Sequence, residues 1–324
     1  MANHYNPVQD MMAAAICQKL FESTPNLQEV EVQARFYLDF APSKKLAKLN
    51  YMFVQVFDWD AEENPRFMEM DKMVKMLESC RESVTELSLS LVGDDVDDEE
   101  VFDDIPQTLF LPSFTSLTRL SIFSLKAYRW GDCLSETNLP NLTHVKLAGC
   151  MQQGFILSDI FAPLLQTHVG ITSLDLEAVY DGDEDNVGIG TDIVRLFPSV
   201  KMLQLKLTVL EEVEDYEDVH LLKQTLRNFA PWKLTWAFVQ VANVRTSGVV
   251  LGTMKGLKRW KGLPRTGVRF FGAGGQRFVL DDTVKKVLLA SREVRWMEIR
   301  GVLMENMDEF EEFIDENDLR ISLE

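Results

Sequence analysis

The chain has 324 residues, of which 46% are hydrophobic, so it can bury a large core as two domains or as one elongated array. Acidic residues outnumber basic ones 51 to 33 and give a formal net charge of −18, which disfavours nucleic acid and anionic membranes as partners. No stretch approaches the roughly 18–20 apolar residues that cross a bilayer, so we expect no membrane span.

The first predicted element is an N-terminal helical cap over residues 7–22. The segment lacks a basic region, and its apolar core, Met11 to Cys17, is short for a signal peptide. The cysteines Cys17, Cys80, Cys133 and Cys150 form no CxxC pair, and the four histidines fall at no ligand spacing. We therefore expect no disulfide framework and no metal site, and a cytoplasmic or nuclear protein.

From Leu27 onward one phrase recurs, apolar-x-x-apolar-x-apolar, and each copy predicts a short strand with one buried face. Clear copies are PNLQEVEV, SVTELSLSL, TSLTRLSIF, PNLTHVKLAGC, ITSLDLEAV, PSVKMLQLKL and REVRWMEIRGV. A weaker copy starts at Tyr51, with Val54 and Val56 as its strand positions. One such strand cannot bury its apolar face alone, so neighbouring copies must stack.

The segments between these copies have helical patterns. They are Met68 to Cys80, Phe155 to Gln166, Thr191 to Phe197 with Thr191 as N-cap, Asp282 to Ala290, and Glu309 to Glu316. Strand, loop and helix in recurring order predict an α/β leucine-rich-repeat solenoid, a horseshoe with parallel strands on its concave side and helices on its convex side. We expect a single array over residues 1–324.

The copy LPNLTHVKLAGC resembles a cysteine-containing leucine-rich repeat of F-box proteins, the substrate-selecting subunits of cullin-based ubiquitin ligases. The resemblance runs from Leu27 to Val302, apart from a less regular stretch. It implies the leucine-rich-repeat fold and substrate recognition for a ubiquitin ligase. The ninth repeat position is cysteine only at Cys150, and no F-box helical motif precedes the first repeat.

Residues 219–280 are expected to be an irregular segment of the array, because the phrase blurs between Leu210 and Val294. The stretches LTWAFVQV and GVRFFGAGGQRFVL indicate strands, and the second is predicted to form a hairpin that turns at Gly274-Gly275.

The same segment, from Val219 to Leu280, contains basic residues and no acidic one. One interpretation is an anion-binding patch within 255–277, for a phosphorylated partner, a phosphoinositide or RNA. Its residues are Lys255, Lys258, Arg259, Lys261, Arg265 and Arg269. Another is internal compensation of acidic loops such as Asp94 to Asp104 and Glu211 to Asp218.

The strand residues that point away from the core are predicted to form a concave surface that binds a protein partner. Aromatic and arginine side chains there would dominate the binding energy. The candidates are Arg119, Phe123, His144, Lys146, Asp175, Glu177, Met202, Trp296 and Arg300, and Ala148 and Glu298 lie in the same rows.

The remaining motifs do not indicate metal binding or catalysis. Asp181 to Asp192 imitates a calcium loop, but Asn186 stands where glycine is needed, so we expect an acidic loop. The run Asp94 to Asp104 is expected to be a solvated insertion, and FFGAGGQRF a turn. We find no catalytic motif in expected spacing, and we expect a non-catalytic protein-interaction scaffold without cofactors.

Overall fold

The computed structural model describes residues 7–55, 69–93, 107–123, 128–130, 132–148, 166–182, 185–210, 216–274 and 277–323. The chain divides into two compact units. The first comprises Met1–Leu147 and Pro163–Gly170, and the second comprises Ala148–Ala162 and Ile171–Glu324. Both units are α/β and are built on parallel strands, as the repeated phrase predicts.

In the first unit, five main strands follow one another in the order β1-β2-β3-β5-β7. Helix α1 occupies the stretch where the N-terminal helix is predicted. The elements are α1 (Pro7–Ser23), β1 (Glu29–Ala34), β2 (Lys48–Gln55), α2 (Met70–Glu78), β3 (Glu86–Gly93), β4 (Gln107–Leu109), β5 (Arg119–Phe123), β6 (Tyr128–Trp130), the 3-10 turn η2 (Asp132–Leu134) and β7 (His144–Ala148). Strands β4 and β6 form a separate parallel pair.

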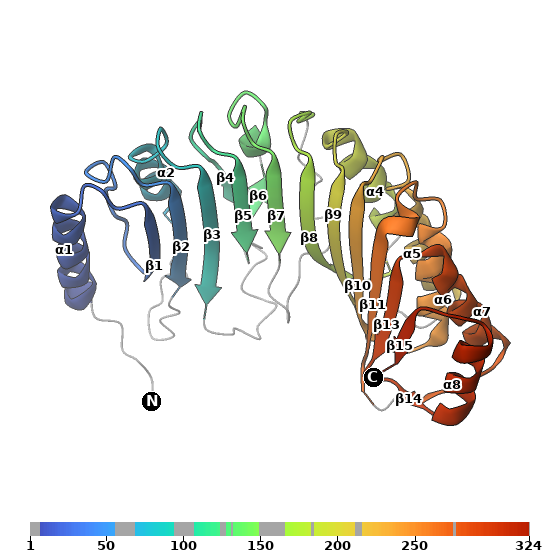
Figure 1. The fold of residues 1–324 in the computed structure, drawn as a ribbon. Coiled ribbons are helices and arrows are strands. Elements are labelled where there is room, and N and C mark those ends of the chain that lie inside the picture. The colour runs from blue at the N-terminus through green and yellow to red at the C-terminus, as the bar shows by residue number, and fades with distance from the viewer. Residues whose placement is uncertain are drawn as a thin grey trace. The chain divides into compact units, whose positions relative to one another are not determined.

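The second unit contains six main strands in the order β8-β9-β10-β11-β13-β15, with helices along one face (Figure 1). Strands β12 and β14 form a separate parallel pair. The elements are β8 (Ser173–Tyr180), α4 (Asp185–Leu196), β9 (Met202–Val209), α5 (Tyr216–Arg227), β10 (Trp236–Val244), α6 (Ser247–Leu257), η3 (Leu263–Arg265), β11 (Thr266–Gly272), β12 (Arg277–Phe278), α7 (Asp282–Ala290), η4 (Ser291–Glu293), β13 (Trp296–Arg300), β14 (Leu303–Met304), α8 (Met307–Glu316) and β15 (Ile321–Leu323).

The core of each unit is made by the apolar positions of the repeated phrase. Leu49, Leu87 and Leu120 are register partners across β2, β3 and β5, and all three are buried. In the second unit Leu174 and Leu203 are partners across β8 and β9, and both are buried. Each such leucine contributes about 1.5–3 kcal/mol by leaving water. The prediction that successive copies stack on adjacent strands is confirmed by these register pairs.

For the weaker copy that starts at Tyr51, the predicted strand positions Val54 and Val56 are wrong. The buried residues of β2 are Leu49, Tyr51 and Phe53, with Leu46 buried ahead of them, whereas Val54 is only half-buried. Val56 lies outside the described residues. This copy of the phrase was not recognised in its correct register because a tyrosine, Tyr51, occupies the third apolar position.

The segment 219–280 is regular where the structure describes it, which corrects the expectation of irregularity. Ala237 in β10 and Thr266 in β11 are register partners and take the buried position that leucine holds elsewhere. The hairpin is also wrong, because β11 pairs in parallel with β10 and β13, while β12 pairs with β14. Gly274 has a φ of +85°, which favours glycine there.

The helix predictions over Met68 to Cys80, Asp282 to Ala290 and Glu309 to Glu316 are confirmed by α2, α7 and α8. Nearly all of Phe155 to Gln166, and the whole acidic run Asp94 to Asp104, lie outside the described residues.

The prediction around α4 is wrong in two respects. The helix begins at Asp185, so Thr191 lies inside it rather than at its N-cap, and the expected acidic loop is helical from Asp185 onward. Gly190 in α4 allows this helix to pack closely on α5. A Cβ at Gly190 would lie 2.8 Å from the carbonyl oxygen of Thr225.

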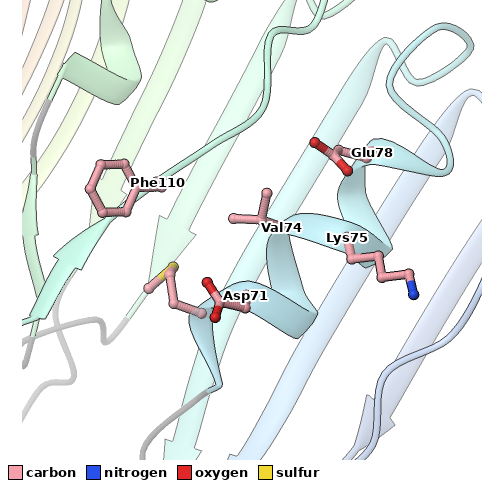
Figure 2. A pocket seen from close by; sticks show the side chains of 6 residues that line it. Asp71, Val74, Lys75, Glu78 and Phe110 are labelled. Carbon is pink, nitrogen blue, oxygen red and sulfur yellow. The ribbon is translucent and has the colours of Figure 1, made fainter.

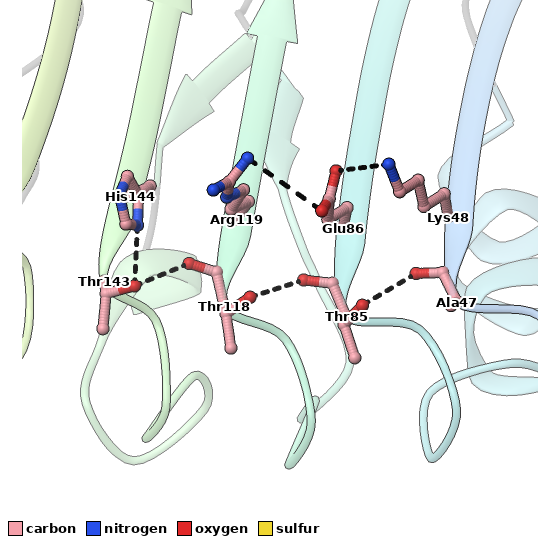
Figure 3. Close-up of polar contacts among 8 residues, drawn as sticks. All are labelled: Ala47, Lys48, Thr85, Glu86, Thr118, Arg119, Thr143 and His144. Atoms are coloured by element: carbon pink, nitrogen blue, oxygen red, sulfur yellow. Dashed lines mark hydrogen bonds and ion pairs between the residues drawn. The ribbon is translucent and has the colours of Figure 1, made fainter.

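A threonine ladder connects the strands of the first unit just before each strand begins (Figure 3). Thr118 Oγ1 donates to the carbonyl oxygen of Thr85 at 3.1 Å, and Thr143 Oγ1 donates to that of Thr118 at 3.2 Å. Each of these carbonyls also accepts two backbone N–H groups of the next copy, as Thr118 does from Thr143 and His144. The ladder holds the starts of neighbouring strands together, a role that we did not anticipate from the sequence.

Candidate protein-interaction surface

The exposed strand face is the set of side chains at alternate strand positions that point away from the buried core. The structure places the predicted candidates on it, and all are exposed or half-buried. They are Arg119 and Phe123 on β5, His144 and Lys146 on β7, Asp175 and Glu177 on β8, Met202 on β9, and Trp296 and Arg300 on β13. Ala148, which we expected on the same face, is 3% exposed and belongs to the core.

In the first unit this face begins with a row of charges (Figure 3). Glu86 lies 3.6 Å from Lys48 Nζ and 4.0 Å from Arg119. Burial, and the positive charge of Arg119, hold the pKa of His144 below its usual value, although Glu86 opposes the shift. Lys146 Nζ lies 5.0 Å from the centroid of the Phe123 ring. Because these ion pairs are exposed, each contributes little to stability.

The second unit carries a denser group on the same kind of face, which we call the aromatic–arginine cluster. It consists of Trp236 and Phe238 from β10, Arg269 and Phe271 from β11, and Trp296, Glu298 and Arg300 from β13. Parallel register brings the three strands together, because Phe238, Gly267 and Trp296 are successive partners in one row. In the next row Arg269 is the partner of Glu298.

Gly267 makes room for the indole of Trp296. A Cβ at position 267 would lie 2.4 Å from two ring atoms of Trp296, so the ring lies against the backbone of β11. Across that glycine, the Trp296 and Phe238 rings are 5.8 Å apart between centroids, with an interplanar angle of 35°. The glycine thus creates a continuous aromatic surface over three strands.

Glu298 holds the two arginines in place. The residue is 7% exposed, and its carboxylate accepts hydrogen bonds from Arg269 Nε and Arg300 Nε. Burial alone would raise the pKa of Glu298, but the hydrogen bonds and charges of the two arginines outweigh it, so the pKa lies below its usual value. The carboxylate therefore remains charged at neutral pH and orients both guanidinium groups.

Arg269 is also surrounded by rings. Its guanidinium carbon lies 5.6 Å from the ring centroid of Phe238, 5.8 Å from that of Trp296 and 5.9 Å from that of Phe271. Cation–π contacts of this kind favour a fixed guanidinium. Proximity in sequence placed Arg269 in the basic patch. Trp236, Phe238 and Phe271 were not predicted, because the strand register of residues 234–272 was not recognised. The signal was the alternation in WAFVQV and VRFF.

The basic patch is divided by the structure. Lys255, Lys258, Arg259, Lys261 and Arg265 are exposed on α6, the turn after it and η3, whereas Arg269 belongs to the aromatic–arginine cluster. Within the described part of the chain, Lys258 is the one residue of these five with an acidic partner, Glu293, at 3.0 Å. Of the acidic loops that could compensate these charges, Asp94 to Asp104 lies wholly outside the described residues, as do residues 211–215 of the loop Glu211 to Asp218.

Two cavities lie elsewhere. One of about 440 Å³ lies between α2 and the exposed Phe110, with Met70, Asp71, Val74, Lys75 and Glu78 as its other lining residues (Figure 2). A smaller one of about 260 Å³ is lined by residues that include Arg245, Ser247 and Arg277. Among the described residues, neither lining includes a histidine or a cysteine. Among the described residues, no group of three His, Cys, Asp or Glu side chains could hold a metal ion.

No protein-family model and no curated protein matches the chain. Within the described ranges, no helix has the length and apolar character needed to cross a membrane.

Proposed function

We propose that this chain is a leucine-rich-repeat protein of the solenoid type, and that it binds another protein through its exposed strand face without catalysing a reaction. The strand order that follows the chain order within each unit supports the repeat assignment. The aromatic–arginine cluster is the single observation that carries the binding function. Trp236 is 40% exposed and its register partner Met202 is 37% exposed, on a face where polar side chains would be expected.

The most concrete version of this proposal is substrate recognition for a ubiquitin ligase in the cytoplasm or nucleus. It rests on the resemblance of the repeat LPNLTHVKLAGC to those of F-box proteins. Among the described residues, Cys17, Cys80 and Cys133 form no disulfide, as is usual in a reducing compartment, and burial raises the pKa of Cys80 to about 12. The partners would then include ubiquitin-ligase subunits.

The test is affinity capture of the full chain from cells, with quantitative mass spectrometry of what it retains. We expect Trp296→Ala combined with Trp236→Ser to lose specific partners, because aromatic anchors dominate interfaces. The matched control combines Arg259→Glu and Lys261→Glu, which changes exposed residues of the basic patch, and should retain the partners. Cullin-ligase subunits among the retained proteins would support the ligase version, and their repeated absence would remove it.

One observation favours a second candidate function, an anion-binding module within residues 255–277. Lys255, Arg259, Lys261 and Arg265 are exposed, and none of the four has an acidic partner within the described ranges. For RNA the segment offers little stacking surface, because Trp260 is buried and donates its indole N–H to the Leu226 carbonyl oxygen at 2.7 Å. Flotation with phosphoinositide vesicles tests this function. It requires binding that weakens steeply with salt and is lost in the Arg259→Glu, Lys261→Glu variant.

A further inference from the structure

Arg269 is the residue of the aromatic–arginine cluster that is best placed to bind a partner. Its Nε donates to Glu298, and its guanidinium lies within 6 Å of three ring centroids, so its orientation is fixed before any partner arrives. Within the described part of the chain, nothing bonds its two terminal amino groups. The side chain is 32% exposed, so these groups can be reached. A fixed guanidinium fork matches a carboxylate through two parallel hydrogen bonds.

The charged side chains around the Arg269 guanidinium favour a negatively charged partner. Arg269 and Arg300 share the single carboxylate of Glu298, so Glu298 alone does not neutralise the two guanidinium groups. On the neighbouring part of the same face, Glu177 is paired with Lys206 at 3.3 Å and is therefore partly neutralised. A complementary partner brings a negative group to Arg269.

The apolar part of the cluster lies at a defined distance from the fork. Phe238 and Trp296 are in the row two strand positions before Arg269, and Trp236 with Met202 is in the row four positions before it. Strands rise about 3.3 Å per residue, so these rows lie about 7 Å and about 13 Å from the fork along the strand direction. An extended segment that runs along the strands has the same rise, so its side chains match these rows at spacings of two and four residues.

From this geometry we infer that the cluster binds an extended acidic protein segment, in which a carboxylate side chain sits on Arg269. A large apolar side chain two or four residues away packs on Trp296 and Phe238, or on Trp236 and Met202. The inference rests on the proposed function, because it names the chemistry of the partner at that same surface.

The experiment selects peptides from a displayed library of random 12-residue sequences on the immobilised full chain. We expect the enriched sequences to share an Asp or Glu two or four positions from a Trp, Phe or Leu. One enriched peptide is then synthesised, and its affinity is measured by fluorescence anisotropy. Arg269→Gln, and replacement of the acidic residue of the peptide by its amide, should each weaken binding about tenfold or more.

Three controls make the result specific. Combining both changes should add little to either one, because they remove the same interaction. Arg269→Lys keeps the charge but not the fork, and should also weaken binding while the fold, followed by circular dichroism, is retained. Arg259→Gln, in the basic patch, should leave the affinity unchanged.

The outcomes separate this inference from the proposed function. If Trp296→Ala abolishes peptide binding and Arg269→Gln does not, the acidic-segment inference is overturned and the interaction surface stands. If neither change affects binding or the capture of cellular partners, the proposed function fails as well. Binding of a phosphoserine peptide at least about tenfold tighter than its glutamate counterpart would overturn the choice of carboxylate.

Discussion

Replacing Gly267 by alanine tests whether the aromatic surface depends on that glycine. The new Cβ would lie 2.4 Å from two ring atoms of Trp296, about 1 Å closer than ordinary van der Waals contact, and the backbone position leaves it no room to move. The indole must therefore turn away and lose its contact with Phe238. Turning away relieves the overlap but removes the aromatic pair with Phe238, so we expect a destabilisation of about 0.5–1.5 kcal/mol.

Urea denaturation followed by far-ultraviolet circular dichroism measures this loss, with Trp296→Ala as the second background. In that background the ring that clashes is absent, so Gly267→Ala should cost less than about 0.5 kcal/mol. A cost of Gly267→Ala that is equal in the two backgrounds would refute the packing of Trp296 over Gly267. The peptide affinity of Gly267→Ala should also fall, because the ring no longer lies beside Arg269.

Three further predictions concern the fold and its charges. Glu298→Gln should lower the free energy of unfolding by about 1–2 kcal/mol at pH 7. The pKa of Glu298 is lower in the folded chain than in the unfolded chain. Its contribution to the free energy of unfolding is therefore present above the unfolded pKa, near 4.3, and is lost as the pH falls through the folded pKa. A stability difference between wild type and Glu298→Gln that is equal at pH 3 and pH 7 would contradict the pairing. Thr118→Val should cost about 0.5–1.5 kcal/mol in the same measurement, because its hydroxyl bonds the Thr85 carbonyl, and no cost would exclude a role for the ladder. Phe21→Ala should cost about 3–5 kcal/mol, because Phe21 is buried against Phe40 with ring centroids 5.2 Å apart, whereas the exposed Ile16→Ala should change stability by less than about 0.5 kcal/mol.

The parallel strands were predictable where leucine fills both strand positions of the phrase. Leu87 with Leu89, and Leu174 with Leu176, alternate with polar residues and are buried as the pattern requires. Strands of this kind can be found by periodicity alone, because one buried face is the physical cause of the alternation.

The sequence indicates the strands within residues 234–272 but not how they pair in the sheet, because small or polar residues replace leucine at their buried positions. Ala237 and Thr266 are fully buried, and the Thr266 hydroxyl is satisfied by the Gly262 carbonyl oxygen at 3.1 Å. A local pattern cannot show that a threonine is buried, because its hydroxyl partner is known only once the chain is folded. The expected irregular segment followed from this obscured feature, whereas the hairpin was predicted from the pair Gly274-Gly275.

The aromatic–arginine cluster shows why the site was harder to predict than the fold. Arg269 was grouped with Lys255 to Arg265 by proximity in sequence, but its partner Glu298 is 29 residues away. Lys206 and Glu177 are also 29 residues apart, and both pairs join neighbouring strands of the sheet. In stacked parallel strands a side chain contacts the one that lies a full repeat away, so charge complementarity must be sought at the repeat spacing. That comparison requires the register of every strand, and the register of β10 and β11 depends on the buried Ala237 and Thr266. A surface of this kind can therefore be predicted from a sequence only after the strand register of its least typical repeats has been assigned.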